Sequence, residues 1–74
     1  MKIPRISGLD VVKKLKRVGF VPTRQRGDHL RLEKNTSDKT IKLTVPLHKE
    51  LKTGTLVQII KQADLTFEQF MNIK

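Results

Sequence analysis

The stretch RQRGDHLRLEKNTSDKTIKLTVPL, residues 24–47, decides the fold of this chain. Apolar and polar side chains alternate over residues 29–33 and again over residues 41–45, which is the period of a strand with one buried and one solvated face. Between them, residues 35–38 are Asn-Thr-Ser-Asp, whose side chains bond their own backbone and favour a loop. The stretch therefore predicts a hairpin whose second strand ends at Pro46.

A further strand is predicted before this hairpin, over residues 20–25, where β-branched and aromatic residues are frequent. Pro22 cannot donate to a strand ladder, so we expect this strand at an edge of the sheet. Arg26 and Gly27 are expected to form the turn into the next strand. Three consecutive strands with short turns predict an antiparallel meander.

Helical patterns flank the strands. Residues 8–18 repeat apolar side chains at helical spacing, with Ser7 suited to the N-cap and Gly19 to a left-handed C-cap. After a basic connection over residues 47–52, a second helix is expected to start within residues 53–55. Its apolar face comprises Leu56, Ile59, Ile60 and Ala63, and a capping box of Thr66 and Gln69 starts a short last helix with Phe67, Phe70 and Met71.

This order predicts an α+β domain, with the helices packed on one face of a three-stranded antiparallel sheet and a solvated opposite face. At 74 residues the chain lies near the lower limit for a self-sufficient core, so residues 1–74 are expected to form one domain. The absence of cysteine excludes disulfides and thiolate metal sites. No signal-peptide pattern and no spanning run of roughly 18 apolar residues is present, so the cytoplasm is the expected location.

The charge of the chain is strongly positive, with 16 Lys and Arg against 7 Asp and Glu, a net charge of +9. Self-repulsion of this size disfavours the compact state, so we expect a partner that neutralises it. Polyanionic nucleic acid is the commonest such partner, and an acidic protein fits equally well. An anionic membrane ranks third, because no predicted helix is long and aromatic-flanked enough to lie in an interface.

The two histidines are the side chains suited to proton transfer near neutral pH. His29 is predicted on the solvated face, near Arg24, Arg26 and Arg31. RNA cleavage without a metal requires such a set, because the imidazole moves a proton while guanidinium groups hold the phosphate. The competing interpretation is an ordinary solvated histidine on a basic strand.

His48 follows the third predicted strand, and a loop histidine bonded to the backbone is favoured over a catalytic one. Neither histidine has neighbours at a familiar metal-ligand spacing, so no metal is expected. The basic face of the helix predicted over residues 8–18 either binds phosphates, as the first helix of a double-stranded-RNA-binding module does, or is only solvated. This face comprises Lys13, Lys14 and Arg17.

Four segments together resemble the HicA family of mRNA interferase toxins in their order and spacing: SGLDVVKKLKRVGF, RQRGDHLRLEK, TVPLHKELKTGTLVQIIKQADL and TFEQFM. The resemblance extends from Ile6 to Met71. Its most specific parts are Arg-Gly-x-His at residues 26–29 and Val-Pro-Leu-His at residues 45–48, followed by Leu-Lys-x-Gly-Thr-Leu at residues 51–56.

The resemblance implies a double-stranded-RNA-binding-like fold, ribosome-independent cleavage of mRNA, no cofactor, and neutralisation by a HicB-type antitoxin. It also implies that the histidine of the family's Gly-Ser-His motif, here His29, is catalytic. Gly27, His48 and Lys52 lie in the matching segments and are possible accessory residues. The alternatives are a non-catalytic RNA-binding module and a surface that chiefly docks an acidic antitoxin.

One position departs from the family, because its serine is Asp28 in this chain. On a regular strand, neighbouring side chains point to opposite faces, so Asp28 need not touch His29. If a bulge brought the two together, the carboxylate would favour a protonated imidazole and repel phosphate.

Overall fold

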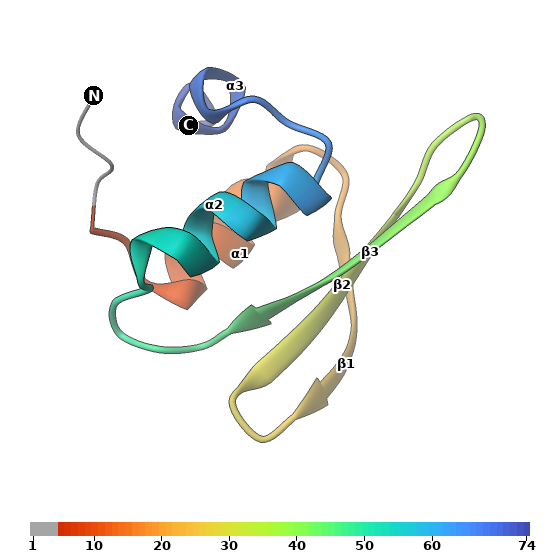
Figure 1. Ribbon diagram of the computed structural model, residues 1–74. Helices are drawn as coiled ribbons and strands as arrows, with labels where there is room; N and C mark the ends of the chain where they lie inside the picture. Colours follow the sequence, from red (N-terminus) through yellow and green to blue (C-terminus); the bar gives the residue numbers. More distant parts are fainter. Residues whose placement is uncertain (1–4) are drawn as a thin grey trace.

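The structure is a computed structural model and describes residues 5–74. Its elements follow the order predicted above, so the α+β class with an α-β-β-β-α layout and a short C-terminal helix is confirmed (Figure 1). No helix within residues 5–74 is long and apolar enough to cross a membrane. The elements are α1 (Gly8–Arg17), β1 (Val21–Arg26), β2 (His29–Asn35), β3 (Thr40–Pro46), α2 (Thr53–Gln62) and α3 (Phe67–Met71).

The three strands form an antiparallel sheet in the order β1-β2-β3, with β1 at an edge as Pro22 predicted. The predicted turn at Arg26 and Gly27 is wrong by one residue. Arg26 still belongs to β1 and pairs with His29, so the two-residue turn consists of Gly27 and Asp28. Gly27 has a φ of 61°, and hairpin turns favour glycine where the backbone must adopt a positive φ.

Helices α1 and α2 cover one face of the sheet (Figure 1). The alternating apolar residues of β2 and β3 are buried on this face, and the opposite face carries the exposed polar residues. Phe70 of α3 is fully buried, whereas Met71 is exposed. The core comprises Val11, Val12, Leu15, Phe20, Leu32, Ile41, Leu43, Val45, Leu51, Leu56, Ile59, Ile60, Ala63 and Phe70.

The capping residues predicted for α1 and α3 are present in the structure. The Ser7 hydroxyl accepts a hydrogen bond from the Asp10 N–H at 3.1 Å and so caps α1. Gly19, just after α1, has a φ of 103°. The capping box of Thr66 and Gln69 at α3 is also present.

The start of α1 lies directly against the segment that follows β3. The Gly8 N–H donates to the His48 carbonyl at 2.9 Å. A Cβ atom added to Gly8 would lie 2.0 Å from the Pro46 carbonyl oxygen, so no larger residue fits without movement of the backbone. On the other side of this segment, the Leu47 N–H donates to the Asp28 carbonyl at 2.6 Å. These contacts join α1, the β1–β2 turn and the residues after β3 at one end of the sheet.

Candidate active site

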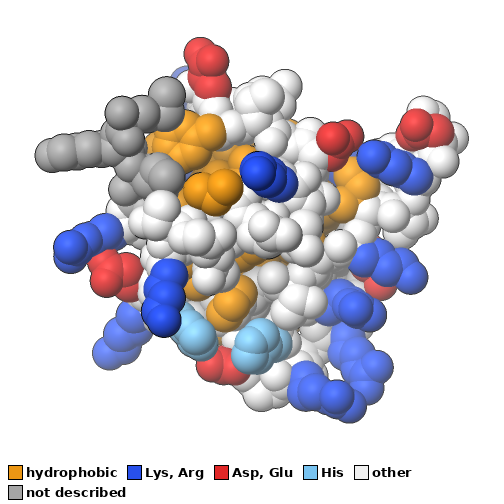
Figure 2. Space-filling view, in the orientation of Figure 1, with side chains coloured by type: hydrophobic (Ala, Val, Ile, Leu, Met, Phe, Trp, Pro, Cys, Tyr) orange, Lys and Arg blue, Asp and Glu red, His pale blue; other side chains and the backbone are white. Residues whose placement is uncertain are grey.

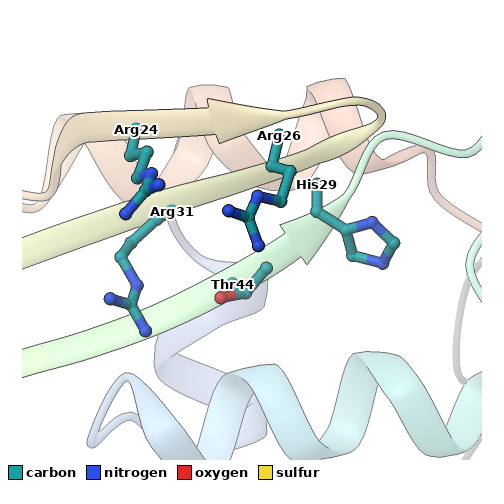
Figure 3. Close-up of a pocket in the computed structure, with 5 residues that line it drawn as sticks. All are labelled: Arg24, Arg26, His29, Arg31 and Thr44. Carbon is teal, nitrogen blue, oxygen red and sulfur yellow. The ribbon is translucent and has the colours of Figure 1, made fainter.

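Three arginines lie together on the solvated face of the sheet. Arg24 and Arg26 come from β1 and Arg31 from β2, and Arg24 is directly opposite Arg31 in the strand pairing. Figure 3 shows their side chains on the same side of the sheet as Thr44 of β3. With His29 these residues line an open hollow of about 290 Å³.

A bulge in β1 places Arg24 and Arg26 on this face. Pro22 is opposite the core residue Leu32, and strict alternation would put Arg24 and Arg26 on the core face with Pro22. The register shifts between Pro22 and Arg24, so both arginines instead lie opposite residues of the solvated face.

The arginine cluster, defined as Arg24, Arg26 and Arg31, is not neutralised by neighbouring acids. Among residues 5–74, none of the three forms a salt bridge. Like charges directly opposite one another on a sheet repel, so the pairing of Arg24 with Arg31 costs free energy in the unliganded protein. An anion bound in the hollow would remove this repulsion.

His29 stands at one end of the arginine cluster, as the first residue of β2. Its side chain is 55% exposed, as expected for the solvated face. In Figure 3 its ring points away from Arg24 and Arg31, along the sheet and past the end of the strands. The imidazole therefore lies at the edge of the hollow, exposed to solvent and not enclosed.

Asp28 contacts His29 directly, which decides between the two arrangements that the sequence left open. The His29 Nδ1 and Asp28 Oδ1 atoms are 2.9 Å apart. The alternation of a regular strand does not apply here, because Asp28 lies in the turn and only His29 lies in β2.

His48 also contacts Asp28, and the expectation of a ring bonded to the backbone is wrong. Its Nε2 atom lies 3.0 Å from Asp28 Oδ2. The rings of His29 and His48 are 6.4 Å apart between centroids, with an interplanar angle of 73°. Figure 2 shows both pale-blue rings side by side on one face, with basic side chains on either side of the pair.

The basic residues of α1 lie apart from the arginine cluster, because α1 covers the opposite face of the sheet. Lys13, Lys14 and Arg17 line a second hollow of about 420 Å³ with Met71 and Lys74 among its other residues. Lys14 is already engaged, since its Nζ donates to the Ile73 carbonyl at 2.6 Å and lies 5.5 Å from the centre of the Phe70 ring.

The remaining accessory candidates have separate positions. Gly27 forms the turn, and Lys52 is the exposed residue that precedes α2. Thr44 lines the arginine hollow but was not singled out in the sequence, because its position depends on the pairing of β3 with Arg31. Within residues 5–74, no group of three or more His, Cys, Asp or Glu side chains is arranged to hold a metal ion.

Fold and surface together define a small basic α+β domain with three unneutralised arginines on one face of its sheet and an imidazole at the end of that face. A family model for the HicA toxin of bacterial toxin–antitoxin systems matches residues 8–65. The chain therefore belongs to the HicA toxin family, and the resemblance seen in its sequence is confirmed. It is the toxin of a toxin–antitoxin system and pairs with an antitoxin. No curated protein matches the chain.

Proposed function

We propose that this toxin is a metal-independent endoribonuclease that cleaves mRNA, with His29 as its catalytic residue. The observation that supports this most directly is the cluster of three unneutralised arginines beside an exposed imidazole. Guanidinium groups bind phosphate through paired N–H donors, and an imidazole transfers protons at neutral pH. Arg24, Arg26 and Arg31 bind the RNA backbone in this proposal, and Lys13 and Arg17 of α1 offer a second, separate phosphate contact on the helix side of the sheet.

The proposed step is an attack by the RNA on itself. His29 Nε2 takes the proton of a ribose 2′-hydroxyl while O2′ forms a bond to the adjacent phosphorus. The bond between phosphorus and O5′ breaks, O5′ takes a proton from water, and the proton held by His29 then returns to solvent. Negative charge grows on the phosphoryl oxygens in the transition state, where the arginine N–H groups stabilise it. The products are a 2′,3′-cyclic phosphate and a free 5′-hydroxyl.

The test is incubation of purified toxin with RNA in the presence of a chelator, followed by analysis of the product ends. We expect cleavage with 2′,3′-cyclic phosphate ends, and no cleavage of the same sequence as DNA or as 2′-O-methyl RNA, because neither has the attacking hydroxyl. Binding of RNA without any product would instead identify a non-catalytic RNA-binding module. Products with 5′-phosphate ends would contradict attack by the internal hydroxyl.

We also propose that the antitoxin is of the HicB type and that an acidic surface on it covers the arginine cluster. The net charge of +9 favours fast association with an acidic partner. Covering the exposed His29 would keep RNA from the site until the antitoxin is removed.

Substitution of Arg31 by glutamine should weaken RNA binding and reduce its dependence on salt. For single-stranded nucleic acid, each lost phosphate contact reduces the magnitude of the slope of log binding constant against log salt concentration by about 0.7. The measurement is a salt titration of binding to 2′-O-methyl RNA, which is not cleaved. Lys61→Gln is the matched control, since Lys61 is an exposed cation on α2, on the opposite face of the sheet. Equal slopes for the two variants would contradict a phosphate contact at Arg31.

A further inference from the structure

A single carboxylate joins the two histidines of this chain. Asp28 Oδ1 lies 2.9 Å from His29 Nδ1, and Asp28 Oδ2 lies 3.0 Å from His48 Nε2. An ionised carboxylate only accepts hydrogen bonds, so both ring nitrogens must carry a proton in these contacts. Each carboxylate oxygen of Asp28 therefore accepts a hydrogen bond from a different imidazole.

This arrangement determines which nitrogen of His29 is free. When the imidazole is neutral, one ring nitrogen carries the proton and the other has the lone pair, and the hydrogen bond at one decides the state of the other. Because Nδ1 donates to Asp28, the lone pair is on Nε2. That is the state a proton acceptor needs, and a carboxylate behind the ring also stabilises the charge that forms when Nε2 takes a proton.

His48 is held by the backbone at the end of the sheet. Its carbonyl accepts from the Gly8 N–H, and the preceding Leu47 N–H donates to the Asp28 carbonyl. The ring therefore approaches Asp28 from a segment that α1 and the turn both anchor. The Asp28 side chain is 56% exposed, so without this second partner its carboxylate would be free to rotate away from His29.

We propose that Asp28 and His48 are positioning residues for His29: Asp28 selects its neutral Nδ1–H form, and His48 holds Asp28 in place. This inference rests on the proposed ribonuclease function for its role in catalysis. His48 does not itself line the arginine hollow, and its Nε2 is occupied by Asp28. Donation from two imidazoles also offsets part of the negative charge that Asp28 would otherwise present to phosphate.

The first test is independent of RNA cleavage. Long-range ¹H–¹⁵N NMR spectra, recorded at a pH at which both imidazoles are neutral, distinguish the Nδ1–H and Nε2–H tautomers of His29. We expect the Nδ1–H form to predominate in the wild type and to lose its predominance in Asp28→Ser. His48→Ala should give a smaller change in the same direction. A wild-type His29 in the Nε2–H form would overturn the proposal, whether or not the protein cleaves RNA.

The second test measures kcat and KM for RNA cleavage. His48→Ala is expected to lower kcat by about tenfold, the effect of one charge-assisted hydrogen bond, with KM unchanged. His48→Gln should retain most of the activity, because its side-chain amide offers an N–H donor in place of Nε2. If glutamine is as damaging as alanine, His48 transfers a proton itself and the positioning role is wrong.

Two controls complete this experiment. Lys49→Ala changes the exposed neighbour of His48 and should leave kcat unaltered. In an Asp28→Ser background, His48→Ala should cause no further loss, because the two residues act through one chain of hydrogen bonds. Additive losses would contradict that coupling. If the wild type shows no cleavage at all, the proposed function fails, while the NMR experiment still decides whether Asp28 sets the form of His29.

Discussion

Replacement of His29 by alanine is expected to abolish RNA cleavage and growth arrest while the fold remains intact. A positioned general base contributes about 10²–10⁴-fold to the rate, so the cleavage product of the variant should fall below detection in a single-turnover assay. The fold should tolerate the change, because the His29 side chain is 55% exposed and lies outside the core. The measurements are the cleavage rate of the purified variant and the growth of cells that express it.

A binding measurement distinguishes the loss of catalysis from the loss of RNA binding. His29→Ala should bind 2′-O-methyl RNA nearly as tightly as the wild type, since the arginine cluster supplies the phosphate contacts in the proposed function. Its thermal unfolding midpoint should also stay close to that of the wild type. Unchanged toxicity in a folded His29→Ala protein would remove His29 from the mechanism.

Replacement of Gly8 by alanine is expected to be strongly destabilising, although it adds only one methyl group. The new Cβ would lie 2.0 Å from the Pro46 carbonyl oxygen and 2.8 Å from the Leu47 Cα, both backbone atoms that cannot rotate away. Overpacking of this kind costs about 3 kcal/mol. Domains of this size have a total stability of about 4–11 kcal/mol, so the loss is a large fraction.

Thermal and urea unfolding measure this effect, with an expected fall in Tm of about 12–24 °C. Gly54→Ala is the matched control, because Gly54 lies in the first turn of α2 and a Cβ there has no atom within 4 Å. That variant should gain about 0.4–1 kcal/mol, since alanine restricts the unfolded chain more than glycine does. Similar Tm values for the two variants would show that position 8 accommodates a Cβ atom beside Pro46 and Leu47, which contradicts the prediction.

Much of the fold was predictable because its signals are local. The alternation over residues 41–45 requires one buried and one solvated face wherever the strand lies. Pro22 is confined to an edge by its missing N–H, and Thr66 with Gln69 forms a capping box from within one turn of chain. Such features depend on residues close together in the sequence, and the structure confirms them.

The candidate site was predictable in its members but not in its contacts. The exposure of His29 follows from the alternation around Leu30 and Leu32, and the structure agrees with it. The contact between Asp28 and His29 was left open, because it depends on where the turn begins. The contact between Asp28 and His48 was missed, because it joins residues on different segments. The internal hydrogen bond of Lys14 was missed for a similar reason, since its acceptor is 59 residues away.

The sequence by itself determined the order of the elements, the positive charge, the edge position of β1 and the presence of an imidazole on the solvated face. These follow from side-chain periodicity, charge and local backbone chemistry, which need no distant contact. The tertiary structure alone decided that the bulge after Pro22 turns Arg24 and Arg26 toward Arg31, and that His48 reaches Asp28. Strand register controls the direction of the arginines, and the close approach of Gly8 to Pro46 controls the position of the segment that carries His48. Both depend on packing between segments that are remote along the chain.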